Sequence, residues 1–481
     1  MDSTDATTLR EKLAAVDQQQ VLRFYDQLDA AGKDRLRAQL LALDLGEIDE
    51  LAEKHVRPKS PLTIPAKIEP VQTYPRRPRP GQEKLYADAD ARGLSLLKDG
   101  NVAAFLVAGG QGTRLGYDGP KGEFPVTPIK NKPLFQVFAE QLLAWSRDAG
   151  RQIPWYLMTS DANDAATRAF FEQNNHFGYD SKNVFIFQQG MMPAFDLMGR
   201  MLLGERGSLA LSPDGHGGSL RALHKSGALA DMKRRGVEHL SYFQVDNPLV
   251  HTIDPLFLGL HDITGSEMSS KTIPKANALE KVGNFAVGDG VLQVIEYSDM
   301  PESLAKQTNA DGTLKFNAGS IAIHALRVSF IERLTASGRL ELLWHRAEKK
   351  VPYVDDAGNA VKPDQPNAVK LEQFVFDAIP LAKNAIVYET ERGEEFSPVK
   401  NAEGTDSPAT SRRDQVRRAA RWLRAAGVDV AMNGDDPRAT LEISPLFAVT
   451  EKHLAARKTS LPPRVGDGAV VYFGAGGPET D

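Results

Sequence analysis

Apolar residues near the start of the chain recur at helical spacing. Within residues 8–54 they fall three or four positions apart, at Leu9, Leu13 and Val16, at Val21, Phe24 and Leu28, and at Leu36, Leu40 and Leu43. This period places them on one face of each helix. The pattern predicts a small helical N-terminal segment. Residues 55–82, which are rich in proline, are predicted to form an extended connector, because proline disrupts regular helix.

From about residue 98 the pattern changes to short apolar runs separated by helical stretches. The runs cover residues 102–108, 155–159, 184–187 and 240–245, and residues 134–145 keep three- and four-residue spacing. Such alternation is typical of a mostly parallel sheet covered on both faces. We therefore predict a doubly wound, Rossmann-like α/β core. Ligands in such folds bind beyond the carboxyl ends of the strands.

The last part of the chain combines a basic helical stretch at residues 412–424 with short strands and turns at residues 465–474. We expect three parts in all. Residues 1–97 would form the helical N-terminal segment and linker, residues 98–390 the central α/β catalytic domain, and residues 391–481 a small C-terminal domain with β structure.

Composition narrows the possible functions. The net charge of −5 over 481 residues argues against a dedicated nucleic-acid binder, which usually carries a strong basic excess. The absence of cysteine excludes disulfides, zinc–thiolate sites and thiol catalysis. No stretch approaches the roughly 18 apolar residues of a membrane helix, and the acidic, polar start lacks the features of a secretory signal. We therefore expect a cytoplasmic protein with no membrane partner.

The strongest local signal is a glycine-rich loop that directly follows an apolar run. Residues 106–116 are LVAGGQGTRLG, and Pro-Lys-Gly follows at residues 120–122. Glycines allow backbone to approach a ligand closely, and successive N–H groups there can form an anion-binding nest. Arg114 and Lys121 add positive charge. The dinucleotide pattern G-x-G-x-x-G fails at Leu115, and the G-K-[ST] ending of a P-loop is absent.

This loop resembles the signature of the uridylyltransferases that act on sugar 1-phosphates, the UDP-N-acetylglucosamine and UDP-glucose pyrophosphorylase family. The resemblance is collinear over roughly residues 70–450. It continues through FQQG at 187–190, SPDGHGG at 212–218, VDN at 245–247, VIEYS at 294–298, FNAG at 316–319, KLEQFVFD at 370–377 and EFSPVKN at 395–401.

The resemblance implies in-line attack of a sugar-phosphate oxygen on the α-phosphorus of UTP, with pyrophosphate leaving. It implies Mg²⁺ on Asp246, which follows the run 240–245. Arg114, Lys121 and Lys400 would act in catalysis. The nucleotide would be bound by Ala108, Gly109, Gly110, Gln111, Gly112, Thr113, Gln189, Gly215, Asp246 and Lys370. The sugar would be bound by His216, Gly283, Glu296, Tyr297 and Asn317.

Two positions depart from the acetylglucosamine enzymes, and both lie near the sugar's 2-substituent in the family. His216 stands where those enzymes carry asparagine and resembles the P-G-H-G motif of the UDP-glucose enzymes. Asn284 replaces an expected aliphatic residue. The sequence therefore leaves N-acetylglucosamine 1-phosphate and glucose 1-phosphate both open. A non-catalytic UDP-sugar-binding regulator is a further alternative, and retention of all the charged positions argues against it.

Overall fold

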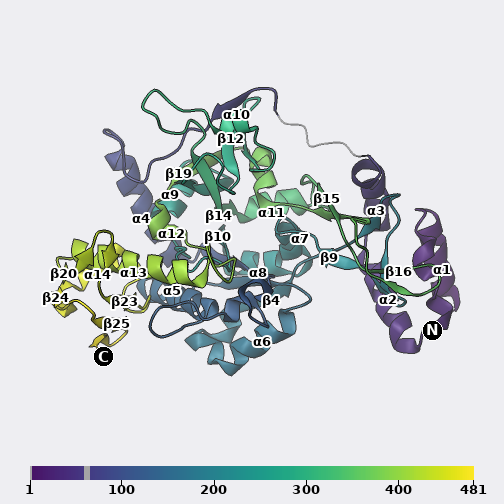
Figure 1. The fold of residues 1–481 in the computed structure, drawn as a ribbon, viewed down its shortest axis with the longest axis horizontal. Helices are drawn as coiled ribbons and strands as arrows, with labels where there is room; N and C mark the ends of the chain where they lie inside the picture. Colours follow the sequence, from purple (N-terminus) through teal and green to yellow (C-terminus); the bar gives the residue numbers. More distant parts are fainter. Residues whose placement is uncertain (1–2, 59–64, 481) are drawn as a thin grey trace. The chain divides into compact units, whose positions relative to one another are not determined.

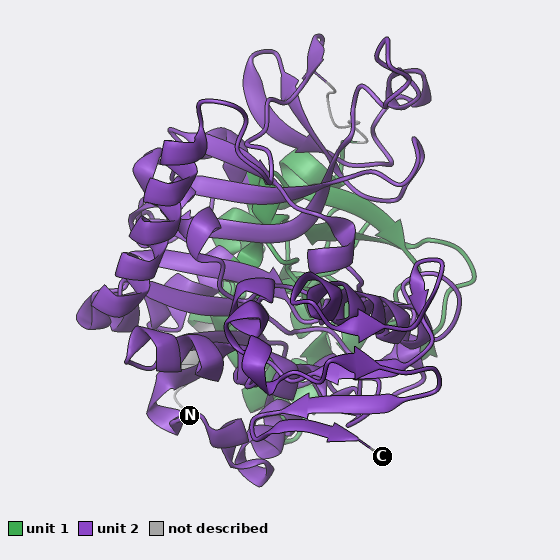
Figure 2. Ribbon diagram, turned by 90° about the vertical axis from the view of Figure 1, so that its left-hand side faces the viewer, with its two compact units in different colours: residues 1–64, 189–219, 341–377 green, residues 65–188, 220–340, 378–481 purple. Residues whose placement is uncertain are grey.

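A computed structural model describes residues 3–58 and 65–480, so residues 59–64 of the predicted connector lie outside the described residues. The chain divides into two compact units. Unit 1 comprises residues 1–64, 189–219 and 341–377, and unit 2 comprises residues 65–188, 220–340 and 378–481 (Figure 1; Figure 2 shows unit 1 in green and unit 2 in purple).

Unit 2 is built on a ten-stranded sheet. Its parallel part follows the predicted apolar runs, with strands in the order β10 (His239–Gln244), β2 (Val102–Val107), β3 (Trp155–Thr159) and β4 (Val184–Gln188). The other strands are β1 (Ile68–Pro70), β11 (Met268–Pro274), β12 (Asn284–Gly288), β13 (Val291–Ile295), β14 (Ala318–Arg327) and β19 (Ala385–Glu389). These strands alternate with helices, which confirms the predicted α/β class.

Antiparallel pairing at β14 brings several strand ends to one edge of this sheet. β14 runs antiparallel to β10 and β11, so its first residues lie where those strands end, with Ala318 opposite Pro274. β12 begins at the same edge, because Asn284 pairs with Gly319. β2 is parallel to β10 and ends there as well. Loops far apart in sequence therefore meet beyond this edge.

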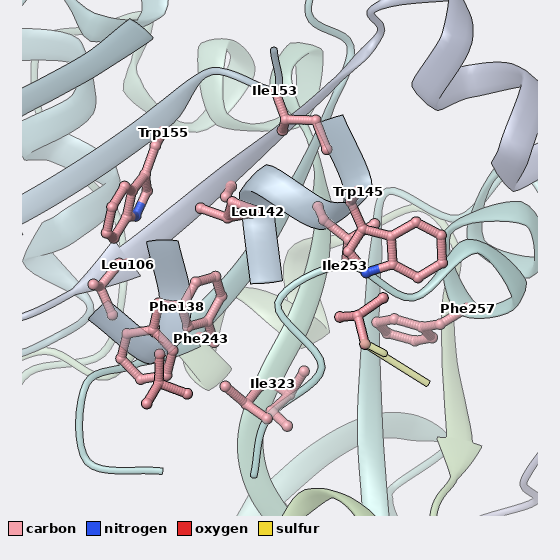
Figure 3. Packing of buried hydrophobic residues seen from close by; sticks show 14 of the residues in the cluster. Leu106, Phe138, Leu142, Trp145, Ile153, Trp155, Phe243, Ile253, Phe257 and Ile323 are labelled. Atoms are coloured by element: carbon pink, nitrogen blue, oxygen red, sulfur yellow. The ribbon is translucent and has the colours of Figure 1, made fainter. Parts of the chain in front are cut away.

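Helices surround the sheet of unit 2. They are α4 (Glu83–Asp99), α5 (Leu134–Ala149), α6 (Asp164–Gln173), α8 (Ala228–Arg235), α9 (Pro255–Ile263), α10 (Glu302–Ala305), α11 (Val328–Thr335) and α12 (Arg392–Glu395), with α7 (Gly218–Lys225) beginning in unit 1. Buried aromatic rings of the helices and strands interlock beneath them. The Phe138 and Phe243 rings meet edge to face at 5.4 Å, beside the buried Leu106 (Figure 3). Such pairs add to the free energy gained by burial.

Two helices of unit 2 pack closely because of a glycine. A Cβ atom on Gly93 of α4 would lie 1.8 Å from the Pro255 carbonyl oxygen of α9. Any larger residue would force the two helices apart, and neighbouring core contacts would be lost with them.

The C-terminal residues of unit 2 have a hydrophobic cluster of their own. It gathers Leu423 of helix α13 (Pro408–Ala425) with Leu441 and Phe473. The other elements are α14 (Glu451–Ala456), β20 (Asp429–Val430), β21 (Met432–Asn433), β22 (Asp436–Pro437), β23 (Thr440–Ile443), β24 (Arg464–Val465), β25 (Val470–Gly474) and β26 (Gly477–Thr480). The predicted basic helix and terminal strands are thus confirmed.

Unit 1 joins the N-terminal helices to two distant segments. The helices are α1 (Ser3–Ala14), α2 (Ala30–Ala42) and α3 (Leu45–Leu51). The strands are β5 (Met191–Pro193), β6 (Phe195–Asp196), β7 (Leu203–Glu205), β8 (Ser208–Leu209), β9 (Leu211–Pro213), β15 (His345–Lys349), β16 (Tyr353–Val354), β17 (Ala360–Val361) and β18 (Ala368–Glu372). Leu13, Leu36 and Leu40 are buried in one cluster with Phe195 and Leu371. The helical N-terminal segment therefore shares one hydrophobic core with the two distant segments.

No helix in the described part of either unit has the length and apolar character needed to cross a membrane.

Candidate active site

The carbonyl groups of the glycine-rich loop, which follows β2, accept hydrogen bonds from two side chains. The side chain of Asn163 donates to the carbonyl of Ala108 at 2.9 Å and to that of Gly110 at 3.3 Å. Ser160 donates to the carbonyl of Gly109 at 2.9 Å. Both side chains follow β3, the neighbouring strand. Sequence reasoning did not identify them, although a position just after a parallel strand was a usable signal.

Several backbone N–H groups of the same loop are unpaired. Within the described residues, the N–H groups of Gly109, Gly110 and Gln111 have no hydrogen-bond acceptor, whereas the Gly112 N–H donates to the Gly119 carbonyl at 2.9 Å. Unpaired successive N–H groups are the feature that binds phosphate oxygens. Thr113 lies at the exposed start of the following turn. The loop therefore has the backbone arrangement that its sequence predicts.

Four charged side chains from three segments interact at this loop, two of them from the loop itself. Lys121 lies against Gly110 and is buried. Burial lowers its pKa, the Asp246 carboxylate opposes that change, and the charges of Arg114 and Lys400 lower the pKa further. The structure thus brings Arg114, Lys121, Asp246 and Lys400 into one electrostatic neighbourhood. Three cations and one carboxylate leave a net positive charge here, which suits a polyanionic ligand.

Lys400 lies close to Lys121 because its segment is hydrogen-bonded to the loop after β10. The Asn247 side chain donates to the Glu395 carbonyl at 2.6 Å and accepts from the Ser397 N–H at 3.1 Å. The Val399 N–H donates to the Asp246 carbonyl at 2.7 Å. Asn247 was not predicted as a site residue, although it follows Asp246 directly and belongs to the VDN motif at 245–247.

Three predicted sugar-binding residues meet at the same edge of the sheet. A Cβ atom on Gly283 would lie 3.1 Å from a carboxylate oxygen of Glu296, so that carboxylate lies over the glycine. The Gly283 carbonyl accepts from Ser320 at 2.8 Å, which fixes it beside the start of β14. Asn317, at that start, accepts from the Lys275 N–H at 2.8 Å. Tyr297 follows Glu296 and is 47% exposed.

Four predicted residues lie in unit 1, where two of the sequence motifs pack together. Gly215 adopts φ +85°, and a Cβ atom there would lie 2.3 Å from the Gln373 carbonyl oxygen, so only glycine fits. Asp214 accepts from the Gln373 N–H and donates its own N–H to Gly190, the neighbour of Gln189. Lys370 is half-buried in β18 opposite Ala347.

His216 is held in a defined protonation state. Its Nδ1 accepts a hydrogen bond from the Val375 N–H at 3.1 Å, and its ring stacks on Phe374 with centroids 5.1 Å apart. Burial, assisted by the neighbouring His345, lowers its pKa to about 4. The ring is therefore neutral at pH 7 and carries its proton on Nε2. His216 can therefore act as a hydrogen-bond donor through Nε2.

A separate cluster of acidic side chains in unit 2 resembles a metal site but contains a lysine ammonium group. His251, Asp254 and Glu395 come close enough to share an ion. The fully buried Lys271 Nζ lies 2.5 Å from Asp254 and 2.6 Å from Glu395. Burial opposes the charge of Lys271, and the two carboxylates overcome this and raise its pKa. The lysine thus supplies the cation, and the cluster fixes Glu395 near Asn247.

Asp246, by contrast, makes no ion pair with any of the described residues. No side chain or backbone group among the described residues donates a hydrogen bond to its carboxylate, whose oxygens are therefore available. A single carboxylate together with phosphate oxygens and water suits a hard divalent cation such as Mg²⁺. The residues at this edge consequently fit such an ion when a phosphate ligand is bound.

These features, an open phosphate nest and a cation cluster at a sheet edge, agree with the comparison to known families. The sequence model of the family described as UTP–glucose-1-phosphate uridylyltransferase matches residues 63–406. The chain belongs to this uridylyltransferase family. The predicted family and enzyme class are confirmed.

Individual members of the family are similar over most of their length. UDP-N-acetylhexosamine pyrophosphorylase-like protein 1 of Xenopus tropicalis is 37% identical over 473 residues, 92% of either chain. UDP-N-acetylglucosamine pyrophosphorylase of Saccharomyces cerevisiae is 40% identical over 348 residues, 70% of this chain and 73% of the other. The solved uridine diphosphate N-acetylglucosamine pyrophosphorylase from Trypanosoma brucei, in complex with inhibitor, has a TM-score of 0.81 at 26% identity, covering 97% and 98% of the two chains.

Proposed function

We propose that this uridylyltransferase joins UTP to N-acetylglucosamine 1-phosphate, forming UDP-N-acetylglucosamine and pyrophosphate, with Mg²⁺ as the metal. The observation that carries the proposal is that Lys121 interacts with Arg114, Asp246 and Lys400 beside the unpaired N–H groups of the glycine-rich loop. The names of the relatives support the acetylated sugar.

The reaction needs no protein nucleophile. An oxygen of the sugar phosphate forms a bond to the α-phosphorus of UTP, and the bond from that phosphorus to the pyrophosphate oxygen breaks. The task of the chain is to align two polyanions and to stabilise the charge that develops between them. In this proposal the loop N–H groups and Arg114 hold the UTP phosphates, Lys121 lies at the α-phosphate, and Lys400 binds the sugar phosphate.

Mg²⁺ bound at Asp246 would neutralise phosphate charge and contribute several kcal/mol to transition-state stabilisation. Gln189 and Gly215, with backbone groups of residues 108–110, would bind the uracil edge, which offers both donors and acceptors. Lys370 would contact UTP. Gly283, Glu296, Tyr297 and Asn317 would bind the hexose, and His216 would donate to it through Nε2.

The test is pyrophosphate release from UTP and Mg²⁺ with N-acetylglucosamine 1-phosphate or glucose 1-phosphate, measured as kcat/KM for each sugar. Preference for the acetylated sugar supports the proposal. Preference for glucose 1-phosphate would favour the second candidate, a UDP-glucose-forming enzyme, for which the histidine at position 216 is the specific motivation. UDP-sugar binding without release from either substrate would contradict both.

A further inference from the structure

Asn284 is a buried amide with an unpaired acceptor. The residue is 1% exposed at the start of β12. Its Nδ2 donates to the Val282 carbonyl at 3.5 Å, and a carbonyl can only accept, which orients the amide. Its Oδ1 has no hydrogen-bond partner. Leaving a buried polar atom unpaired costs free energy, so such an atom in a native protein requires an explanation.

The same residue lines a cavity at the sheet edge. The cavity has a volume of about 240 Å³ and is bordered by Lys275, Glu280, Tyr297 and Met300, as well as Asn284. About 15 Å³ is enough for one water molecule, so there is room for a substantial part of a ligand. All of these residues belong to unit 2.

The walls of this cavity suit a polyhydroxylated ring. The Lys275 ammonium donates to the Ala278 carbonyl at 2.9 Å, and the Glu280 carboxylate is paired with Arg392 at 2.6 Å. The Glu280 carboxylate is thus paired with a cation. The Lys275 ammonium bonds a neutral carbonyl and keeps donors that can bind the hydroxyl oxygens of a sugar. Tyr297 contributes an exposed aromatic ring, a surface on which the C–H face of a sugar can pack. The unsatisfied group is Asn284 Oδ1, which needs a donor.

The cavity adjoins the residues assigned to the hexose. Asn284 follows Gly283 directly, and Tyr297 follows Glu296. Lys275 is bound through its backbone to Asn317. A hydrogen-bond donor on the hexose is therefore the ligand group that Asn284 Oδ1 can bind.

We propose that Asn284 is a specificity-determining residue, whose Oδ1 accepts a hydrogen bond from a hydroxyl or acetamido N–H of the sugar 1-phosphate. This inference rests on the proposed function. It explains why a costly unpaired acceptor persists in the free protein, since the substrate would satisfy it.

The experiment compares wild type with Asn284→Leu, which keeps the side-chain size and removes the acceptor. Loss of one hydrogen bond should raise the KM for the sugar 1-phosphate about tenfold and leave the KM for UTP unchanged. The Tm of the free protein should be equal or higher, because the unpaired group is gone. Asn284→Ala serves if the leucine does not fit. Gln293→Leu, on the neighbouring strand β13 and outside the cavity, is the matched control and should leave both KM values unchanged.

A sugar series identifies the donor. If the tenfold effect disappears with 2-deoxyglucose 1-phosphate, the donor is on the 2-substituent; if it remains, the donor is another hydroxyl, and both results support the inference. Unchanged sugar KM in both variants, with an active wild type, would overturn this inference alone. A wild type inactive with every sugar would overturn the proposed function and this inference with it.

Discussion

The amide of Asn247 and the carbonyl of Glu395 are joined by a 2.6 Å hydrogen bond, and this bond connects the two segments that carry Asp246 and Lys400. The Asn247 Oδ1 accepts from Ser397, so one side chain bridges two backbone positions of the second segment. Asn247 is therefore a positioning residue, which acts through Lys400.

Asn247→Ala should lower kcat by about a hundredfold, because a displacement of about 1 Å in a reacting group has an effect of that size. The measurement is steady-state pyrophosphate release, with Tm recorded in parallel. Asn101→Ala is the matched control, since Asn101 also bonds a carbonyl, that of Gly236 at 3.0 Å, but precedes β2 at the opposite edge of the sheet. Equal losses in the two variants would mean that Asn247 contributes only to stability.

Asp246→Asn should lower kcat/KM at least a hundredfold with little change in Tm, because it removes a metal ligand worth several kcal/mol and leaves the fold intact. Titration of Mg²⁺ against pyrophosphate release measures the effect. Asp161→Asn, an exposed carboxyl just after β3, should behave as wild type. Wild-type turnover by the Asp246 variant would refute the metal assignment.

Lys400→Ala should raise the KM for the sugar 1-phosphate at least tenfold and the KM for UTP much less, because charge-assisted hydrogen bonds to phosphate are among the stronger ones. Initial rates with each substrate varied in turn separate the two constants. Lys458→Ala, an exposed lysine of the C-terminal segment, is the control. Equal increases in both KM values would contradict this placement of Lys400.

Protonation of His216 should destabilise the protein in acid. The folded-state pKa of about 4 lies below the ordinary value of 6.5, so the folded state binds fewer protons than the unfolded chain. The stability that this group contributes is complete above pH 6.5 and is lost as the pH falls toward 4. Thermal unfolding between pH 7.5 and pH 4.5 should show a smaller fall in Tm for His216→Gln than for wild type.

The exposed His224→Gln variant should keep the wild-type dependence of Tm on pH. Burial also lowers the pKa of His239 to about 4. Both variants should therefore keep part of the fall in Tm at acid pH. Identical dependences of Tm on pH for His216→Gln and wild type would show that protonation of His216 does not destabilise the folded protein.

Lys271→Met should lower the free energy of unfolding by about 3–5 kcal/mol, because it leaves buried Asp254 and Glu395 without their cation. Urea denaturation measures the loss. Lys84→Met removes an exposed pair with Asp88 and should cost at most about 1 kcal/mol. A Lys271 variant as stable as the Lys84 variant would contradict the structural role of this ion cluster.

Much of the candidate site could be predicted from local sequence. The loop 106–116 contains its glycines, its arginine and the apolar strand before it, and the structure forms an open nest of N–H groups there. His216 was predicted to bind the sugar, but its tautomer depends on Val375, which is distant in sequence. Asn247, Asn163 and Lys271 were missed because their partners lie on other elements.

The sequence by itself determined several local elements: the helices of residues 8–54, the four parallel strands of the central sheet and the basic helix at residues 412–424. It could do so because side-chain periodicity is a property of neighbouring residues. Only the tertiary structure decided that residues 189–219 and 341–377 share a core with the N-terminal helices. It also decided that the segment of Lys400 is bonded to Asp246, through the Val399 N–H. These relations depend on strand register, packing and long-range hydrogen bonds, which no local pattern encodes.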